Sequence, residues 1–184
     1  MIGCDRGGIE EHAVSKGVER MPASEGVANP VDVGADEAAR SDRPWIVPAG
    51  WTEDPEPRQM RLATYIAPDP SGPVEVAVSR FGGRVGGDLA NINRWRGQMG
   101  LPAIEEAELD AAIARFSAPG FDGYETRIEA PSGVMLAAGV YDEAIGQMWF
   151  VRATVPDAAV ADRLQADVFS IARSIAGLGD VGDD

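Results

Sequence analysis

The clearest feature of the sequence is a series of strand-length apolar segments from Trp45 onward. In residues 74–81 the side chains alternate, so that Val74, Val76 and Val78 share one face of an extended strand. Short runs rich in Pro, Gly, Ser and Asp separate three neighbouring pairs of segments, and connections of this length join antiparallel strands. Altogether the patterns predict strands at residues 45–48, 61–67, 74–81, 124–129, 134–141 and 148–155.

Helical spacing marks the segment between the third and fourth predicted strands. A helix is predicted over residues 88–99, with Asp88 as its N-cap and Gly100 as its end. A second helix is predicted over residues 105–116, and its acidic first turn suits the helix dipole. The side chains expected to face the core are Leu89, Ile92, Trp95 and Met99 in the first helix, and Leu109, Ile113 and Phe116 in the second.

A third helix closes the predicted fold. It begins after the cap Asp157, runs to about residue 176, and is followed by Gly177 as a natural C′ residue. The predicted order is therefore β-β-β-α-α-β-β-β-α. This order indicates an α+β class with a mainly antiparallel sheet of about six strands flanked by helices.

Residues 1–44 differ in composition from the rest of the chain. They combine acids and bases with many Gly, Ala, Ser and Pro residues, and they contain no aromatic residue and no sustained apolar period. Such a segment buries too little apolar surface to offset the entropy of ordering, so it is predicted to be a disordered acidic tail or tether. A short helix around residues 9–20 is the alternative. We expect one α+β domain at residues 45–176 and a frayed acidic tail at residues 177–184.

The formal net charge of −14 limits the classes of partner. Nucleic-acid affinity depends on Lys and Arg neutralising phosphates, so no nucleic-acid partner is expected. Binding to anionic lipid through a basic patch is excluded for the same reason. The acidic surface favours solubility and suits a basic protein partner.

The chain offers little material for catalysis or metal binding. His12 is the only histidine, and it lies in the predicted tail. Histidine-dependent catalysis and a histidine-based zinc site are therefore not expected in the domain. We expect no cofactor, no metal and no enzymatic activity. An enzyme that uses carboxylates with Arg94 or Arg96 is the weaker alternative.

The segment around residues 82–98 is the strongest candidate for binding. Gly86 and Gly87 belong to a Gly-rich loop before a helix, where backbone N–H groups can hold an anion, although the loop is neither a Walker A motif nor a dinucleotide fingerprint. The following helix could present a recognition surface for a carboxylate or a protein partner. In the alternative interpretation, its arginines pair with local acids and its Asn side chains fix loops. The candidate set on this helix is Asn91, Asn93, Arg94, Arg96 and Gln98.

Cys4 is the only cysteine, so no intramolecular disulfide can form. Together with the preceding Ile2 and Gly3, it resembles the end of a bacterial lipobox, in which the cysteine becomes acylated. A flexible tail before a folded domain is the usual layout of such lipoproteins. No hydrophobic signal segment precedes Cys4 in this sequence, so a lipid anchor requires a longer reading frame. The alternative is an incidental cysteine.

Residues 76–101, VAVSRFGGRVGGDLANINRWRGQMGL, resemble a motif of uncharacterised exported bacterial proteins of the planctomycete type. The resemblance extends over most of residues 45–176, through Trp45 and Trp51, a strand of the MWFVRATVP type and a final amphipathic helix. The element order is similar to that of the PsbP-like fold, an antiparallel sheet between helices. Proteins of that fold serve as accessory or binding modules on membrane-bound complexes, and the resemblance supplies no catalytic residues.

These observations favour a non-enzymatic, extracytoplasmic binding or accessory module. The resemblance implies a place in the periplasm or on the outer face of a bacterial membrane, with a lipid anchor at Cys4 and a protein partner or membrane complex. The alternative is a cytosolic acidic domain that docks a basic protein.

Overall fold

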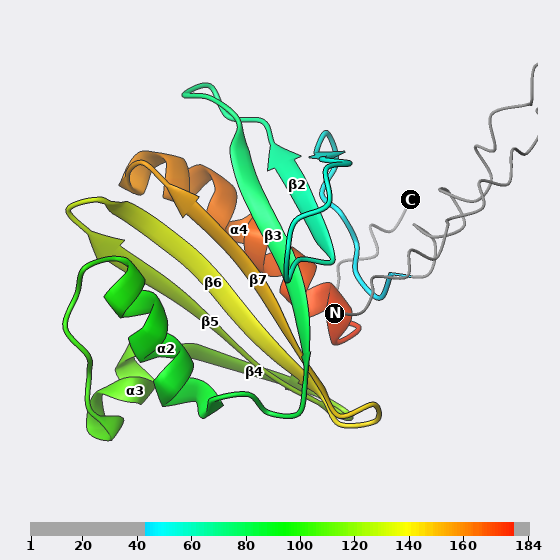
Figure 1. Ribbon diagram of the computed structural model, residues 1–184, viewed down its shortest axis with the longest axis vertical. Helices are drawn as coiled ribbons and strands as arrows, with labels where there is room; N and C mark the ends of the chain where they lie inside the picture. Colours follow the sequence, from blue (N-terminus) through cyan, green and yellow to red (C-terminus); the bar gives the residue numbers. More distant parts are fainter. Residues whose placement is uncertain (1–42, 179–184) are drawn as a thin grey trace, which may run out of the picture.

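Seven antiparallel strands form one sheet in this computed structural model, which describes residues 43–178. The α+β class and the antiparallel sheet predicted from the sequence are confirmed. The strand order across the sheet is β1-β2-β3-β7-β6-β5-β4 (Figure 1). The strands are β1 Thr52–Glu53, β2 Ala63–Ala67, β3 Val74–Gly82, β4 Ala114–Ala118, β5 Phe121–Ala130, β6 Gly133–Asp142 and β7 Gln147–Val155.

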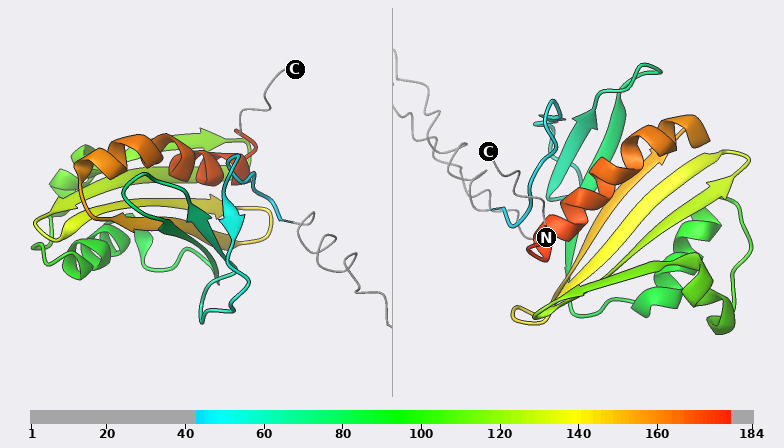
Figure 2. Two further views of the ribbon diagram at one scale, coloured as in Figure 1. Left: turned by 90° about the horizontal axis from the view of Figure 1, so that it is seen from above. Right: turned by 180° about the vertical axis from the view of Figure 1, so that it is seen from behind.

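The three helices within residues 43–178 lie on both faces of the sheet (Figures 1 and 2). One face is crossed by α4, Ala158–Ile175. The opposite face carries α2, Gly87–Gln98, and α3, Glu106–Ala112. We call these surfaces the α4 face and the α2 face. Because side chains alternate along each strand, both faces receive apolar residues, and the sheet separates two hydrophobic clusters.

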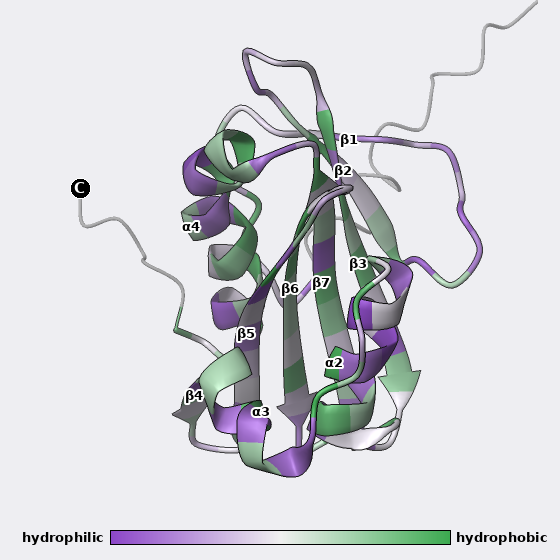
Figure 3. Cartoon of the chain, turned by 90° about the vertical axis from the view of Figure 1, so that its left-hand side faces the viewer, coloured by the Kyte–Doolittle hydropathy of each residue, from purple (hydrophilic) through white to green (hydrophobic). Residues whose placement is uncertain are grey.

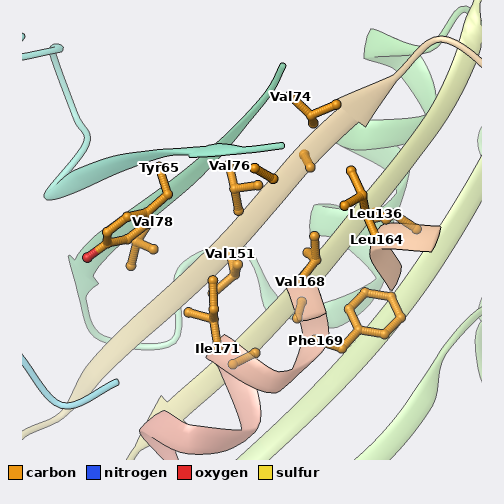
Figure 4. Close-up of a cluster of buried hydrophobic side chains, with 14 of the residues drawn as sticks. Tyr65, Val74, Val76, Val78, Leu136, Val151, Leu164, Val168, Phe169 and Ile171 are labelled. Atoms are coloured by element: carbon orange, nitrogen blue, oxygen red, sulfur yellow. The ribbon is translucent and has the colours of Figure 1, made fainter. Parts of the chain in front are cut away.

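The larger cluster lies under α4 (Figure 4). The Asp157 carboxylate caps this helix by accepting from the Val160 backbone N–H at 3.0 Å, as predicted. Gly177, with a φ of 70°, ends the helix in the left-handed conformation expected of a C′ glycine. The helix carries an apolar stripe at helical spacing, and the side chains of this stripe are all buried against the sheet: Val160, Leu164, Val168, Ile171 and Ile175.

The predicted strand at residues 45–48 is wrong. Prolines before the segment and at its end remove backbone donors, and the segment is held through its side chains instead. The Trp45 ring meets the Trp149 ring edge to face, with centroids 5.8 Å apart, and Trp45 Nε1 donates to the Tyr65 hydroxyl at 2.9 Å. The first strand is β1, two residues long, which pairs with β2.

The predicted helix at residues 105–116 is too long. The helix α3 ends at Ala112, Ile113 is extended, and the chain continues as β4, the strand missing from the predicted order. Pairing of β4 with β5 satisfies the outer edge of β5, which a longer helix would leave open. Leu109 and Ile113 join the cluster under α2 and α3, as predicted, whereas Phe116 packs against the cluster of the α4 face.

Asp88 is not the N-cap of α2. The cap is Gly86, whose φ of 75° favours glycine, and the helix therefore begins at Gly87. Asp88 lies in the first turn, where its carboxylate accepts from Arg115 at 2.7 Å. The predicted helix end is confirmed, since Gly100 has a φ of 75° and the Leu101 N–H donates to the Arg96 carbonyl at 2.9 Å.

Several predictions fall outside the part of the chain that the structure describes. These are the tether at residues 1–42, including Cys4 and His12, and the tail at residues 179–184. Between residues 43 and 178, none of the helices has the length and apolar character needed to cross a bilayer. Within the same range, no three His, Cys, Asp or Glu side chains are grouped as a metal site requires.

Candidate ligand-binding groove

A groove of about 570 Å³ opens on the α2 face, between α2 and the loop that joins β1 to β2. Figure 3 shows this loop and α2 on the side of the sheet away from α4. Strands β3 and β7 form the floor. We call this site the arginine groove, and its residues are Gln59, Met60 and Arg61 from the loop, Ser79, Phe81, Phe150 and Arg152 from the floor, and Val85, Arg94, Trp95 and Gln98 from α2 and the segment before it.

Local periodicity explains how these side chains reach one site. In β7, Trp149 and Val151 belong to the α4 face. Because side chains alternate along a strand, Phe150, which lies between them, and Arg152, which follows Val151, belong to the α2 face. In α2, residues four apart are neighbours on the helix surface, which places Arg94 beside Gln98. The Gln98 Oε1 atom accepts from Arg152 Nη1 at 3.0 Å and thereby links the helix to the floor.

Two arginines of the groove have no acidic partner. Within residues 43–178, neither Arg94 nor Arg152 lies within 4.0 Å of a carboxylate. The Arg94 guanidinium lies over the Phe150 ring, 5.9 Å from its centroid. Arg61, by contrast, pairs with Glu75 at 3.2 Å. The groove therefore carries positive charge that the surrounding protein does not balance.

The lowered pKa of Arg152 also indicates unbalanced positive charge in the groove. Burial lowers the pKa of Arg152, and the like charges of Arg94 and Arg61 lower it further. An arginine nevertheless stays protonated in proteins, so its charge persists inside the groove. A bound anion would replace the lost hydration and separate the like charges. The arrangement is chemically suited to holding an oxyanion.

A second hollow of about 400 Å³ adjoins the arginine groove, because Arg61, Gln98 and Arg152 line both. Its other side chains include Glu75 and Thr154. Arg152 therefore lies at the junction between an aromatic hollow and a more polar one.

The Gly-rich loop lies at a different place. Gly86, Gly87 and Asn91 line a cleft at the start of α2, together with Asp88 and Arg115. This cleft is less suited to a charged ligand, because Asp88 and Arg115 form an ion pair with each other. The Asn91 Nδ2 donates to the Val85 carbonyl at 3.0 Å, whereas its buried Oδ1 has no hydrogen-bond partner among the described residues.

Two further candidates fix the connection between α2 and α3. The Asn93 side chain donates to the Ile104 carbonyl at 3.0 Å and accepts from the Ile104 N–H at 2.8 Å. Arg96 Nε donates to the Pro102 carbonyl at 2.9 Å. Of the seven residues predicted around α2, the structure thus brings only Arg94 and Gln98 into the arginine groove. Whether the others bind a ligand stays a prediction.

Sequence reasoning missed the groove residues that come from the strands and the loop. Arg152 carried a signal, since it is the only charged residue between Gln147 and Val155. A lone arginine on one side of an otherwise apolar strand indicates a special environment. Arg61 and Met60 carried no such signal, because only the path of the β1–β2 loop brings them to the groove.

No known protein family matches the chain, and no curated protein matches it in sequence. Among solved structures, the chain is similar to the crystal structure of LpqN, which is involved in cell envelope biogenesis of Mycobacterium tuberculosis, with 16% identity and a TM-score of 0.38 over 69% of this chain and 77% of that chain. A likeness at this level assigns neither a family nor a function. The resemblance to exported bacterial proteins and to the PsbP-like fold stays a prediction.

Proposed function

We propose that this protein is a non-enzymatic binding module whose arginine groove holds an organic anion. The observation that carries the proposal is the presence of two arginines, Arg94 and Arg152, in one groove with no carboxylate partner among residues 43–178. Ligand pockets usually combine apolar side chains with polar groups that orient the ligand. The groove has a typical volume and combines five apolar residues with six polar or charged ones.

The unpaired arginines of the groove stand out because acidic residues outnumber basic ones in this chain. The chain carries a net charge of −14, and eight arginines of residues 43–178 form ion pairs with Asp or Glu. Four do not, namely Arg80, Arg94, Arg96 and Arg152, and two of these line the groove. Leaving like charges together in a partly buried site costs stability. A ligand that neutralises these charges would offset the loss of stability.

The polar groups of the groove favour binding over chemistry. Apart from arginines, they are the amides of Gln59 and Gln98 and the hydroxyl of Ser79. A protonated guanidinium is not a proton acceptor, and an amide neither donates a proton to a substrate nor attacks it. These groups can orient and neutralise an anion.

The extracytoplasmic location and the lipid anchor at Cys4 belong to the same proposal, as does a protein partner or membrane complex. Their support is the Ile-Gly-Cys sequence and the motif resemblance. The chain enters the described domain on the α4 face, where Trp45 packs on Trp149 and the Ile46 N–H donates to Ser174 Oγ at 2.9 Å. This entry point lies on the face of the sheet opposite the groove. Metabolic labelling with a fatty acid, compared between the full reading frame and its Cys4→Ser variant, tests the anchor.

The groove itself is tested by NMR of the arginine side chains in the full chain. Titration with inorganic phosphate should shift the Nε–Hε signals of Arg94 and Arg152 saturably. The variants Arg94→Gln and Arg152→Gln should weaken binding by roughly tenfold, as expected for a charge-assisted hydrogen bond. Arg80→Gln is the matched control, because Arg80 also lacks a carboxylate partner but stacks on Trp149 outside the groove. Equal shifts at Arg80 and Arg152, or none at all, would overturn the proposal.

A further inference from the structure

We infer that the anion held by the arginine groove is a single-chain amphiphile, with an oxyanion head at Arg94 and Arg152 and an alkyl chain along the aromatic floor. This inference rests on the proposed function and adds the chemical class of the ligand's body. Three features of the groove carry it: apolar side chains beside the charges, an uncovered methionine at the rim, and a floor strand, β7, that is paired on both sides.

Aromatic rings adjoin the unpaired charges directly. The Phe81 and Phe150 ring centroids are 5.9 Å apart, and Trp95 meets Phe150 edge to face at 5.6 Å. Phe81 is only partly buried and lines the groove beside Val85. Trp95 and Phe150 are buried, so the apolar surface still open to water beside them belongs to Phe81 and Val85. A small inorganic anion at Arg152 would leave that surface in water, whereas an attached hydrocarbon chain would cover it.

Met60 is held uncovered at the rim of the same groove. Its side chain is 69% exposed, and its φ of 63° makes it the only non-glycine residue at positive φ among residues 43–178. Arg58 holds the turn, since it contacts Asp54 at 2.8 Å and Glu75 at 3.0 Å. A flexible thioether adapts readily to apolar ligands. The turn thus presents an apolar side chain opposite the aromatic floor.

Strand β7 offers no edge to a peptide ligand. It pairs with β3 and β6 on its two sides, so its backbone N–H and C=O groups are engaged in the sheet and a peptide cannot add to it as a further strand. Strand β3 pairs with β2 only over Val74–Val78, and its residues Ser79–Gly82 pair with β7 alone. A ligand recognised by its charge and its apolar body does not need backbone groups.

The position of Arg152 sets the direction of the chain. The adjoining hollow beyond Arg152 contains Glu75 and Thr154, which disfavour hydrocarbon. The head therefore lies at the junction near Arg152 and Gln98, and the chain runs toward Phe81 and Met60.

Calorimetric titration of the full chain with acetate, hexanoate and decanoate, below micelle-forming concentrations, tests the inference. Affinity should rise about three- to fourfold for each methylene that the groove covers. Decanol, which lacks the charge, should bind at least tenfold more weakly than decanoate. Met60→Ser should weaken decanoate binding several-fold more than it weakens acetate binding. Ile145→Ser is the matched control, because Ile145 is an exposed apolar residue outside the groove.

Failure of this inference can be told apart from failure of the proposed function. If phosphate and acetate bind but longer chains gain nothing, the amphiphile is wrong and anion binding stands. If decanol binds as well as decanoate, or Arg152→Gln leaves decanoate binding intact, the oxyanion head is wrong. If no anion of either series perturbs Arg94 and Arg152, both proposals fail.

Discussion

Each face of the sheet has an arginine that links a strand to a helix, but the two arginines have different kinds of partner. On the α4 face, charge is paired closely: Arg173 donates to both oxygens of the buried Glu125 at 2.6 and 2.7 Å, and Arg163 donates to both oxygens of Asp69 at 2.7 and 2.9 Å. On the α2 face, the hydrogen-bond partner of Arg152 within the described part of the chain is an amide, that of Gln98. Both faces belong to one sheet, so the difference reflects what covers each face.

The helices cover the two faces of the sheet to different extents because they differ in length. The helix α4 has 18 residues and an apolar stripe that spans the sheet, whereas α2 and α3 have 12 and 7 residues. The shorter helices leave part of β3 and β7 as the floor of the arginine groove. The α4 face therefore covers the larger hydrophobic cluster, and the α2 face leaves room for the proposed ligand. Comparing similar substitutions on the two faces tests this division.

The largest expected effect comes from removing a buried isoleucine on each face. Ile171 of α4 and Ile92 of α2 are both completely buried. Ile171→Ala should lower the free energy of unfolding by about 4 kcal/mol, and Ile92→Ala by about 2.5 kcal/mol, because the smaller cluster under α2 is bordered by half-buried side chains that can relax into the space. Urea unfolding of both variants measures the difference. Equal costs would show that the α2 face is as rigid as the α4 face.

Replacing an arginine by methionine should change the free energy of unfolding in opposite directions on the two faces. Arg173→Met leaves the Glu125 carboxylate buried without its partner, so stability should fall by about 2 kcal/mol. Arg152→Met removes an unpaired charge and keeps the apolar stem, so stability should stay the same or rise by roughly 0.5 kcal/mol. Only Arg152→Met should weaken anion binding, by roughly tenfold or more. Thermal unfolding and phosphate titration of the two variants provide the measurement, and a clear loss of stability in Arg152→Met would contradict it.

Most of the fold could be predicted because its elements follow local patterns. The hairpins formed by β2 with β3 and by β5, β6 and β7 show clear apolar segments joined by turn residues, and α4 shows its cap, stripe and C′ glycine in the sequence. The errors occurred where distant contacts decide the structure. Residues 114–118 have the composition of a helix end, yet they form β4 because β5 offers an unpaired edge. Residues 45–48 have the composition of a strand, yet the side chains of Trp45 and its neighbours anchor them.

The groove was less predictable than the fold for the same reason. Arg94 and Gln98 could be chosen because helical spacing places them together beside Trp95. Nothing in that spacing shows that β7 brings Arg152 beneath them, or that the β1–β2 loop brings Met60 to the opposite wall. Asn93 and Arg96 have the same composition as their neighbours, and only the path of the α2–α3 connection shows that they bind its backbone. A binding site built from four separate segments requires the tertiary structure.

The smallest expected effect is a pH dependence confined to the α4 face. The Asp69 side chain is 1% exposed, and hydrogen bonds from Arg163, followed by the Ser71 N–H, lower its pKa from 3.8 to about 2. A carboxylate whose pKa is lower in the folded state contributes stability that is fully present above its unfolded pKa and is lost as the pH falls toward its folded pKa. Asp69→Asn should therefore be less stable than the wild type at pH 7, and the difference should shrink below about pH 4 and vanish near pH 2.

Urea midpoints of both proteins between pH 7 and pH 2 measure this difference, in which the titration of all other acids cancels. Arg152→Gln provides the control from the α2 face. No carboxylate contacts Arg152 among the described residues, so the difference between Arg152→Gln and the wild type should not change across the same pH range. A constant difference for Asp69→Asn would show that its ion pair with Arg163 contributes nothing to folding. A pH-dependent difference for Arg152→Gln would reveal an acidic partner for the groove within the protein itself, and the groove would then be occupied without any ligand.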